Sequence, residues 1–280
     1  MNMPNKALLY MKQFIAMRKL SHLHYRENTG IRSLAIAFEK SQKKNFTSEE
    51  EVWMDKIESL RHELCSSSKE ISIIDYGAGS PDLHLTKEEM QCGRISITTV
   101  GDICRTCSTP RSWSFFLFSC IREFKPTITL ELGTCLGISA SYLAAASKLN
   151  GAGRVVTLEG DKAMTHLAAR NFLKLGLDNA CVIAGRFEDT LDLVLTKHGP
   201  MDFVFIDGHH DERATLDYFE RIYPFLSERA MLIFDDISWS EGMRRAWNLI
   251  DSDKRINFSA DLSKFGICII DDRIERKFGI

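Results

Sequence analysis

The chain has 280 residues, of which 44% are hydrophobic and 26% are charged, and its formal net charge is -2. This composition is typical of a globular protein and excludes collagen-like, disordered and multi-span membrane chains. Because 36 basic residues balance 38 acidic ones, we expect no general attraction for nucleic acid. No apolar run approaches the ~20 residues that cross a bilayer, so no membrane partner is expected either.

The cysteines and the N-terminal residues together indicate a reduced, cytoplasmic protein. Lys6, Lys12 and Lys19 interrupt the N-terminal stretch, which therefore lacks the apolar core of a secretory signal. Cys104 and Cys107 form a C-x-x-C pair, but no second pair follows at the spacing of a zinc ribbon. Free thiols are the favoured interpretation, over a metal or redox site.

Residues 1–122 are predicted to form a mainly helical N-terminal extension. Apolar residues from Leu8 to Met17 recur at helical spacing, and a second helix is predicted to begin at the capping box Thr47-Ser48-Glu49-Glu50. A β-like run, a glycine-containing segment, a region without a clear pattern and a further helix follow in turn, at 71–74, 75–81, 91–111 and 113–121.

Residues 123–280 alternate short apolar strands with helices, which is the pattern of a parallel sheet covered on both faces. The last two strands lack a long helix between them and are predicted to form an antiparallel hairpin. The expected fold class is a doubly wound, Rossmann-like α/β sheet of seven strands. The predicted strands are 128–132, 154–159, 180–184, 202–207, 230–235, 256–262 and 266–271, and helices between them are 138–149, 164–175 and 212–226.

Two glycine segments compete as the ligand-binding loop at the carboxyl ends of these strands. Segment 131–139 follows a strand and opens directly into a helix of small residues, so its backbone can approach a ligand closely. Segment 75–79 runs into Pro81 and is interpreted as a structural turn. Because Glu131 precedes the first glycine and would repel a pyrophosphate, the loop favours the cationic ligand S-adenosylmethionine over NAD. Glu159 ends the next strand at an offset that suits ribose hydroxyls.

Motifs across 121–236 resemble the class I S-adenosylmethionine-dependent methyltransferases, especially the metal-dependent catechol O-methyltransferase-like group and a bacterial subset of it. The likeness spans most of the second part of the chain, with its motifs in the family's order. These motifs are LELG-x-x-x-G-x-S at 130–139, VVTLEGD at 155–161, Gly185-Arg186-Phe187, DFVFIDGHH at 202–210 and LIFDDISW at 232–239.

The resemblance implies a set of cofactor-binding residues. Glu159 would accept hydrogen bonds from both ribose hydroxyls, which charged acceptors strengthen, while Arg186 and Phe187 would lie beside the adenine. Glu131 and the loop glycines would line the methionine part. The alternative for Glu159 is a solvated acid at a strand end. The full set is Glu131, Gly133, Thr134, Gly137, Ser139, Glu159, Gly160, Gly185, Arg186, Phe187 and Asp207.

Three carboxylates, those of Asp207, Asp235 and Asp236, end neighbouring strands and are expected to converge at one edge of the sheet. A cation or protons must neutralise such a cluster, and Mg²⁺ prefers oxygen ligands. The resemblance implies a divalent metal held by these three residues, although Asp236 stands where the relatives carry Asn. The alternative is that Asp235 and Asp236 cap a helix beginning at Ile237.

His210 and Asp207 are the expected catalytic residues. His210 lies three residues beyond Asp207, where the resembling enzymes carry a lysine base. An imidazole with an ordinary pKa of ~6.5 can accept the proton of a phenol or an alcohol near neutral pH. The alternative is a structural histidine that caps the next helix or binds the backbone.

The expected activity is methylation of a small-molecule oxygen with help from Mg²⁺, in which the acceptor oxyanion attacks the sulfonium methyl group in line. Residues 1–122 would form a cap on the acceptor side or the contact of a homodimer. Two alternatives stay open. The first is metal-free methylation of nitrogen or of a peptide, and the second is a catalytically silent module that binds S-adenosylmethionine.

Overall fold

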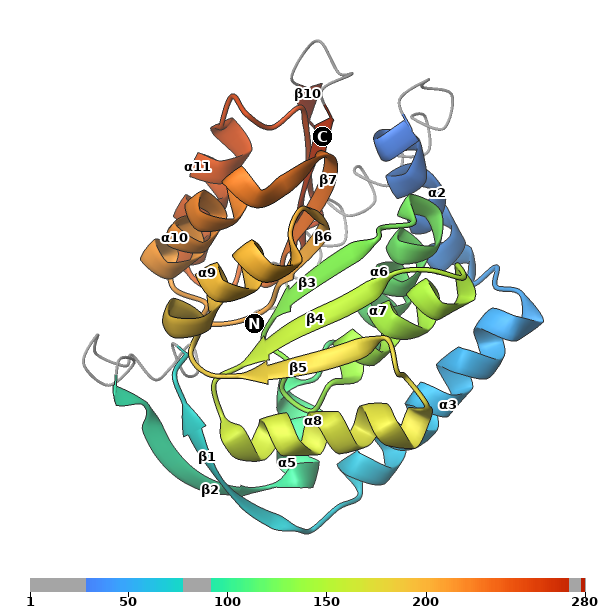
Figure 1. The fold of residues 1–280 in the computed structure, drawn as a ribbon, viewed down its shortest axis with the longest axis vertical. Helices are drawn as coiled ribbons and strands as arrows, with labels where there is room; N and C mark the ends of the chain where they lie inside the picture. The colour runs from blue at the N-terminus through green and yellow to red at the C-terminus, as the bar shows by residue number, and fades with distance from the viewer. Residues whose placement is uncertain (1–28, 78–91, 272–277, 280) are drawn as a thin grey trace, which may run out of the picture.

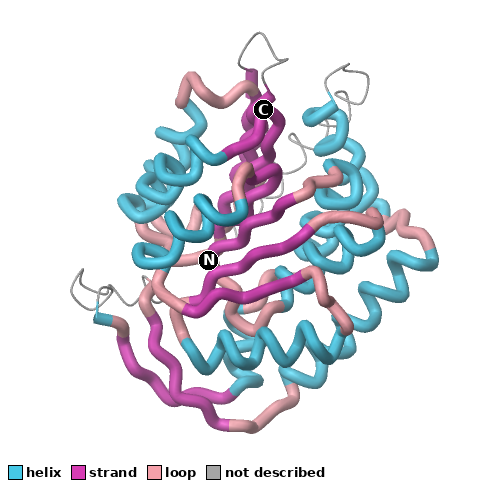
Figure 2. Tube along the Cα trace, in the orientation of Figure 1, coloured by secondary structure: helices cyan, strands magenta, loops and turns pink. Residues whose placement is uncertain are grey.

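The computed structural model describes residues 29–77, 92–271 and 278–279 (Figure 1). The predicted helix over 8–17 and the glycine at position 79 lie outside these ranges. A twisted sheet forms the centre of the molecule, and helices cover both of its faces, as Figure 2 shows. Within the described ranges, no helix is long and apolar enough to cross a membrane.

The central sheet has the predicted doubly wound α/β arrangement. Its strand order is β10-β8-β9-β7-β6-β3-β4-β5; β9 runs antiparallel to β7 and β8, and the other neighbouring pairs are parallel. The seven longer strands and their terminal antiparallel hairpin are confirmed, and the short β10 extends the edge beside β8. The strands are β3 (Ile128–Leu132), β4 (Arg154–Glu159), β5 (Ala180–Ala184), β6 (Met201–Ile206), β7 (Leu226–Phe234), β8 (Phe258–Asp261), β9 (Gly266–Asp271) and β10 (Phe278–Gly279).

Alternating side chains of the strands divide the core into two layers. Along β6, Phe203 and Phe205 belong to one apolar cluster, whereas Val204 and Ile206 belong to the other. The first cluster is completed by α2 (Thr29–Lys43), α3 (Ser48–Cys65), α5 (Val100–Cys107), α6 (Arg111–Phe124), α7 (Ile138–Leu149) and α8 (Lys162–Leu175). The second is covered by α9 (Phe187–His198), α10 (Glu212–Ile222), the short 3-10 helix η2 (Tyr223–Phe225) and α11 (Glu241–Ser252).

The helices that precede β3 are part of the core; α2 contacts β7 and β9 of the sheet, whereas α3 packs on α7 and α8. The predicted capping box starts α3, because Thr47 Oγ1 accepts from the Glu50 N–H and Glu50 Oε2 accepts from the Thr47 N–H. Helix α2 packs along α6, where the rings of Phe38 and Phe116 meet edge to face with centroids 5.7 Å apart. Since these helices share one apolar cluster with Phe205 and other strand residues, they are a layer of the core. The predicted boundary near residue 122 falls within α6.

The region without a clear sequence pattern contains β2 (Arg94–Thr99) and α5. Strand β2 pairs antiparallel with β1 (Glu70–Asp75) in a separate two-stranded ribbon. The Ile74 N–H donates to Asp161 Oδ2 over 2.9 Å, just after β4. This contact ties the end of β1 to the edge of the sheet at which β4 ends.

Candidate active site

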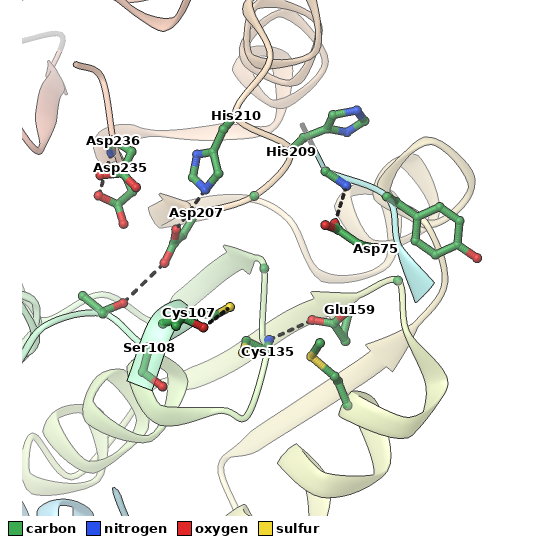
Figure 3. A pocket seen from close by; sticks show the side chains of 18 of the residues that line it. Asp75, Cys107, Ser108, Cys135, Glu159, Asp207, His209, His210, Asp235 and Asp236 are labelled. Carbon is green, nitrogen blue, oxygen red and sulfur yellow. Dashed lines mark hydrogen bonds and ion pairs between the residues drawn. The ribbon is translucent and has the colours of Figure 1, made fainter. Parts of the chain in front are cut away.

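A cavity of about 490 Å³ opens at the carboxyl ends of β3, β4, β6 and β7 (Figure 3). This volume suits a small-molecule ligand, and open α/β sheets bind ligands at this edge. The loops after these strands form much of the wall, together with the end of β1 and the connection from α5 to α6. Its ionisable lining includes Glu159, Asp207, His210, Asp235, Asp236 and Lys264.

The glycine loop after β3 passes against the loop that follows β6. A Cβ on Gly133, whose φ is 103°, would lie only 1.9 Å from the carbonyl oxygen of Asp207, so glycine alone fits this close approach. Gly137 has φ 78° and immediately precedes α7. The predicted order of strand, glycine loop and helix is therefore confirmed. At Gly133, the wall of the cavity is therefore formed by backbone without a side chain.

Glu159 is held in place at the end of β4. Its Oε2 accepts from the Cys135 N–H over 2.7 Å, and its Oε1 accepts from the Asp161 N–H over 2.9 Å. Burial raises the pKa of Glu159 to about 7, against the lowering effect of these hydrogen bonds. Two backbone donors from different loops thus fix this carboxyl group as an acceptor in the cavity wall.

Glu131 does not line the cavity. It is fully buried, its Oε2 accepts from Thr157 Oγ1 over 2.5 Å, and its Oε1 has no hydrogen-bond partner among the described residues. Burial raises the pKa of Glu131 to about 7. A buried oxygen without a partner is a place where a bound N–H or cationic group is stabilised.

Asp207, Asp235 and Asp236 all line the cavity, and a lysine lies among them. Among the described residues, no group of three or more histidine, cysteine, aspartate or glutamate side chains is placed to hold a metal ion. Lys264 Nζ lies 2.7 Å from Asp235 Oδ1 and 2.6 Å from Asp236 Oδ1. Burial raises the pKa of Asp207 to about 7, and burial with the nearby charge of Asp207 raises the pKa of Asp235. The lysine therefore supplies the positive charge that this group of carboxyls requires.

Asp235 and Asp236 do not cap a helix at Ile237, so that alternative is wrong. Residues 235–238 form a turn, 239–240 form a bend, and α11 begins at Glu241. Its N-cap is Ser240, whose Oγ accepts from the Met243 N–H over 3.1 Å. The two aspartates are thus free of a capping role and point into the cluster (Figure 3).

His210 points from the loop after β6 toward Asp207, whereas its neighbour His209 points away (Figure 3). His210 Nε2 lies 3.8 Å from Asp207 Oδ1. Its backbone has φ 46°, and its N–H donates to the Gly208 carbonyl oxygen over 2.9 Å. The helix-capping alternative is wrong for His210, because Asp211 is the N-cap of α10. The sharp turn leaves the imidazole in the cavity beside a carboxyl group.

The remaining predicted cofactor residues divide into two sets. Gly160, Arg186 and Phe187 line the cavity, and Arg186 Nε also donates to Asp189 Oδ2 over 2.9 Å. The others lie in the adjoining loops and helix without lining it: Thr134, Gly137, Ser139 and Gly185.

The structure adds wall residues that the sequence did not indicate. The interpretation of 75–79 as a structural turn is incomplete, because Asp75, Tyr76 and Gly77 line the cavity. Asp75 Oδ1 does accept from the Gly77 N–H over 2.8 Å, as in a turn. A Cβ on Gly160 would lie 2.8 Å from the Tyr76 ring, so this ring packs directly on the loop after β4. The sequence feature that could have indicated this part of the wall is the glycine pair of segment 75–79.

Other additional wall residues come from segments outside the predicted cofactor-binding motifs. Cys107 and Thr109 enter from the end of α5, and Lys264 enters from the hairpin between β8 and β9. Thr109 Oγ1 donates to Asp207 Oδ2 over 3.3 Å.

Comparison with known proteins supports this geometry. Residues 130–237 match the family model of a methyltransferase domain. A "probable O-methyltransferase" of Mycobacterium tuberculosis is 28% identical over 216 residues, which cover 68% of this chain and 86% of the relative. An O-methyltransferase from Bacillus cereus, solved in complex with S-adenosylhomocysteine, is 25% identical with a TM-score of 0.51, over 60% of this chain and 84% of that one. A methyltransferase of Podospora anserina shares the fold at 21% identity and a TM-score of 0.51, over 58% and 79% of the two chains.

The sheet order, the glycine loop and the strand-end acid define a class I S-adenosylmethionine-dependent methyltransferase. Within this class, its sequence is similar to that of O-methyltransferases. The carboxyl groups of the cavity suit a ligand that carries sulfonium and ammonium charges, and the loop after β3 lacks the phosphate cradle of a dinucleotide site.

Proposed function

We propose that this enzyme transfers the methyl group of S-adenosylmethionine to an oxygen atom of a small molecule, with His210 as the general base. One observation carries the proposal. The His210 imidazole lies in the same cavity as the glycine loop and Glu159, with Nε2 3.8 Å from Asp207 Oδ1. The names of the bacterial relatives favour oxygen as the acceptor atom.

The proposed position of the cofactor follows from the cavity wall. The ribose hydroxyls donate to Glu159, whose carboxyl group is already oriented by two backbone N–H groups. The adenine lies between the loop after β5, with Arg186 and Phe187, and the Tyr76 ring. The methionine part passes Gly133, where the backbone leaves room. Thr134 and Ser139, which do not line the cavity, would support this loop from behind.

The proposed chemistry is a single displacement. The acceptor hydroxyl gives its proton to His210 Nε2 as its oxygen attacks the sulfonium methyl carbon. The O–H bond and the S–CH₃ bond break, an O–CH₃ bond forms, and S-adenosylhomocysteine leaves with its sulfur neutral. Asp207 stabilises the imidazolium that results, since an opposite charge nearby favours the charged form of histidine.

A divalent metal, which the family resemblance implies, does not fit the donor set as it stands. Two of its three expected ligands, Asp235 and Asp236, are already ion-paired with Lys264. A divalent cation on the same oxygens would lie next to the ammonium group, and like charges repel. We therefore assign no step of the reaction to a metal.

The test is an assay of the full chain with S-adenosylmethionine and a panel of phenols, alcohols, amines and peptides, with products identified by mass spectrometry. We expect O-methyl products. His210→Ala should lower the rate about 100-fold or more, the typical contribution of a general base, while the affinity for S-adenosylhomocysteine stays within about twofold. The matched control is His166→Ala, an exposed histidine of α8, which should keep the full rate.

Three results would contradict the proposal. Methylation confined to amines or peptides would show a different acceptor class. Binding of S-adenosylhomocysteine without transfer to any acceptor would indicate a silent binding module. Full activity in His210→Ala would remove the histidine from the mechanism while leaving the acceptor class intact.

A further inference from the structure

We propose that Lys264 is the resident cation of this active site: its ammonium group replaces a divalent metal among the strand-end aspartates and binds the acceptor oxygen. The inference rests on the proposed O-methyl transfer. It also narrows the substrate class, because an ammonium group can bind a single hydroxyl oxygen and does not need the paired oxygens that chelate a metal.

The backbone around Lys264 is built to hold the side chain in this position. The Ile237 N–H donates to the Lys264 carbonyl oxygen over 3.1 Å, and the Lys264 N–H donates to the Leu262 carbonyl oxygen over 2.8 Å. The hairpin loop is thereby tied to the loop that carries Asp236. The next residue, Phe265, is fully buried, and its ring centroid lies 4.5 Å from that of Trp113. Lys264 therefore enters the cavity from a fixed hairpin.

Charge balance favours the same role. The Asp235 side chain is 3% exposed and that of Lys264 is 22% exposed, so much of this ion pair is shielded from water. The ammonium group of Lys264 thereby neutralises carboxylates that would otherwise repel one another.

The ammonium group also has capacity for a substrate. It carries three N–H donors, and Asp235 and Asp236 take two of them. Lys264 lines the same cavity as His210. A third N–H directed to the acceptor oxygen would stabilise the negative charge that develops there as His210 takes the proton. Lys264 and His210 then act on the same oxygen atom.

The experiment compares wild type, Lys264→Gln and Lys264→Arg, with the exposed Lys254→Gln as the matched control. Mn²⁺ binding is followed by electron paramagnetic resonance in the presence of S-adenosylhomocysteine, and transfer to a monophenol is measured with and without EDTA. We expect wild type, Lys264→Arg and Lys254→Gln to bind no stoichiometric Mn²⁺, and wild-type transfer to survive EDTA. Lys264→Gln should lose about 100-fold in rate, the typical effect of removing an oxyanion donor, and should gain a Mn²⁺ site.

Stoichiometric Mn²⁺ binding by wild type, with transfer abolished by EDTA, would overturn the proposal even if O-methylation is confirmed. So would unchanged transfer in Lys264→Gln. If no variant and no acceptor gives an O-methyl product, the proposed function fails, yet the Mn²⁺ comparison still tests the place of Lys264. Lys264→Arg keeps the charge and shows whether loss of activity in Lys264→Gln reflects only loss of folding.

Discussion

At the scale of single residues, the thiol of Cys107 lies in the cavity wall, next to Cys135 of the glycine loop (Figure 3). A hydrogen bond from Cys135 outweighs burial and lowers the pKa of Cys107 to about 6. Since the thiolate is the nucleophile, we expect iodoacetamide to alkylate Cys107 readily at pH 7. S-adenosylhomocysteine at ten times its Kd should slow the reaction about tenfold, because the bound ligand leaves only about a tenth of the sites open.

Peptide mapping by mass spectrometry would follow each cysteine separately. Cys92 is exposed and does not line the cavity, so its alkylation should not respond to the ligand. Equal protection of both cysteines would indicate a general tightening of the protein. No protection of Cys107 would place the ligand elsewhere.

The contrast between Glu159 and Lys264 shows which residues of the cavity could be predicted. A residue that ends a parallel strand has a fixed place at the ligand edge, so Glu159 and Asp207 were predicted from motif and strand order together. Lys264 follows β8 in a hairpin, and its reach into the site depends on how that hairpin packs against the loop that carries Asp236. That Glu131 does not line the cavity also depends on packing, which a sequence pattern does not contain.

At the scale of elements, Glu50 connects three helices. Its side chain is fully buried; Oε1 accepts from Lys40 Nζ of α2 and from Arg122 Nε of α6, each over 2.8 Å. Its Oε2 accepts from the Thr47 N–H at the start of α3. Burial raises the pKa of Glu50, but the hydrogen bonds from Lys40, Thr47 and Arg122 lower it by more, so the pKa lies below its ordinary value.

We therefore expect Glu50→Gln to lower the free energy of unfolding by about 3–5 kcal/mol at pH 7, because Arg122 loses the carboxylate it pairs with and Lys40 keeps only the more distant Glu123, at 3.7 Å. The folded-state pKa is lowered, so this stabilisation is present above the unfolded pKa of about 4.5 and is lost as pH falls through the folded pKa. Urea denaturation of wild type and variant at pH 7 and pH 3 measures both effects. The exposed neighbour Glu49→Gln should change stability by less than about 0.5 kcal/mol, and an equal loss there would refute the assignment.

The helices and strands differ in how well the sequence predicts their positions. Strands β3, β4, β5 and β9 have the predicted bounds, because each is a short run rich in apolar residues and bounded by turn residues. The start of α3 was predicted from its capping box. Strand β2 was missed although Ile95 and Ile97 alternate with polar residues, because it is short and lies in an outer ribbon. Its isoleucines are 70% and 75% exposed, so the alternation does not mark a face that packs on the core.

At the scale of the whole molecule, the formal net charge of -2 counts every carboxyl group as ionised. Some carboxyl groups, however, are buried in the folded protein. Burial raises the pKa of Glu131 and of Glu159 to about 7 in each case. In an unfolded chain both groups would titrate near their ordinary value of ~4.5. Between these pH values the folded protein binds protons that the unfolded chain releases.

The stability of the cofactor-free enzyme should therefore fall as pH rises from 5 to 8. The contribution of each raised carboxyl is fully present below ~4.5 and lost as pH rises through about 7, at ~1.4 kcal/mol per pKa unit, or ~3 kcal/mol for each group. Urea unfolding at pH 5.5 and pH 8.0 measures this slope. S-adenosylmethionine should stabilise the protein more at pH 8.0, because its cationic groups and ribose donors favour ionised carboxylates. Glu131→Gln and Glu159→Gln should each flatten the slope, whereas the exposed Glu228→Gln should leave it unchanged. A stability that rises over this pH range would show that these carboxyl groups are ionised in the folded protein.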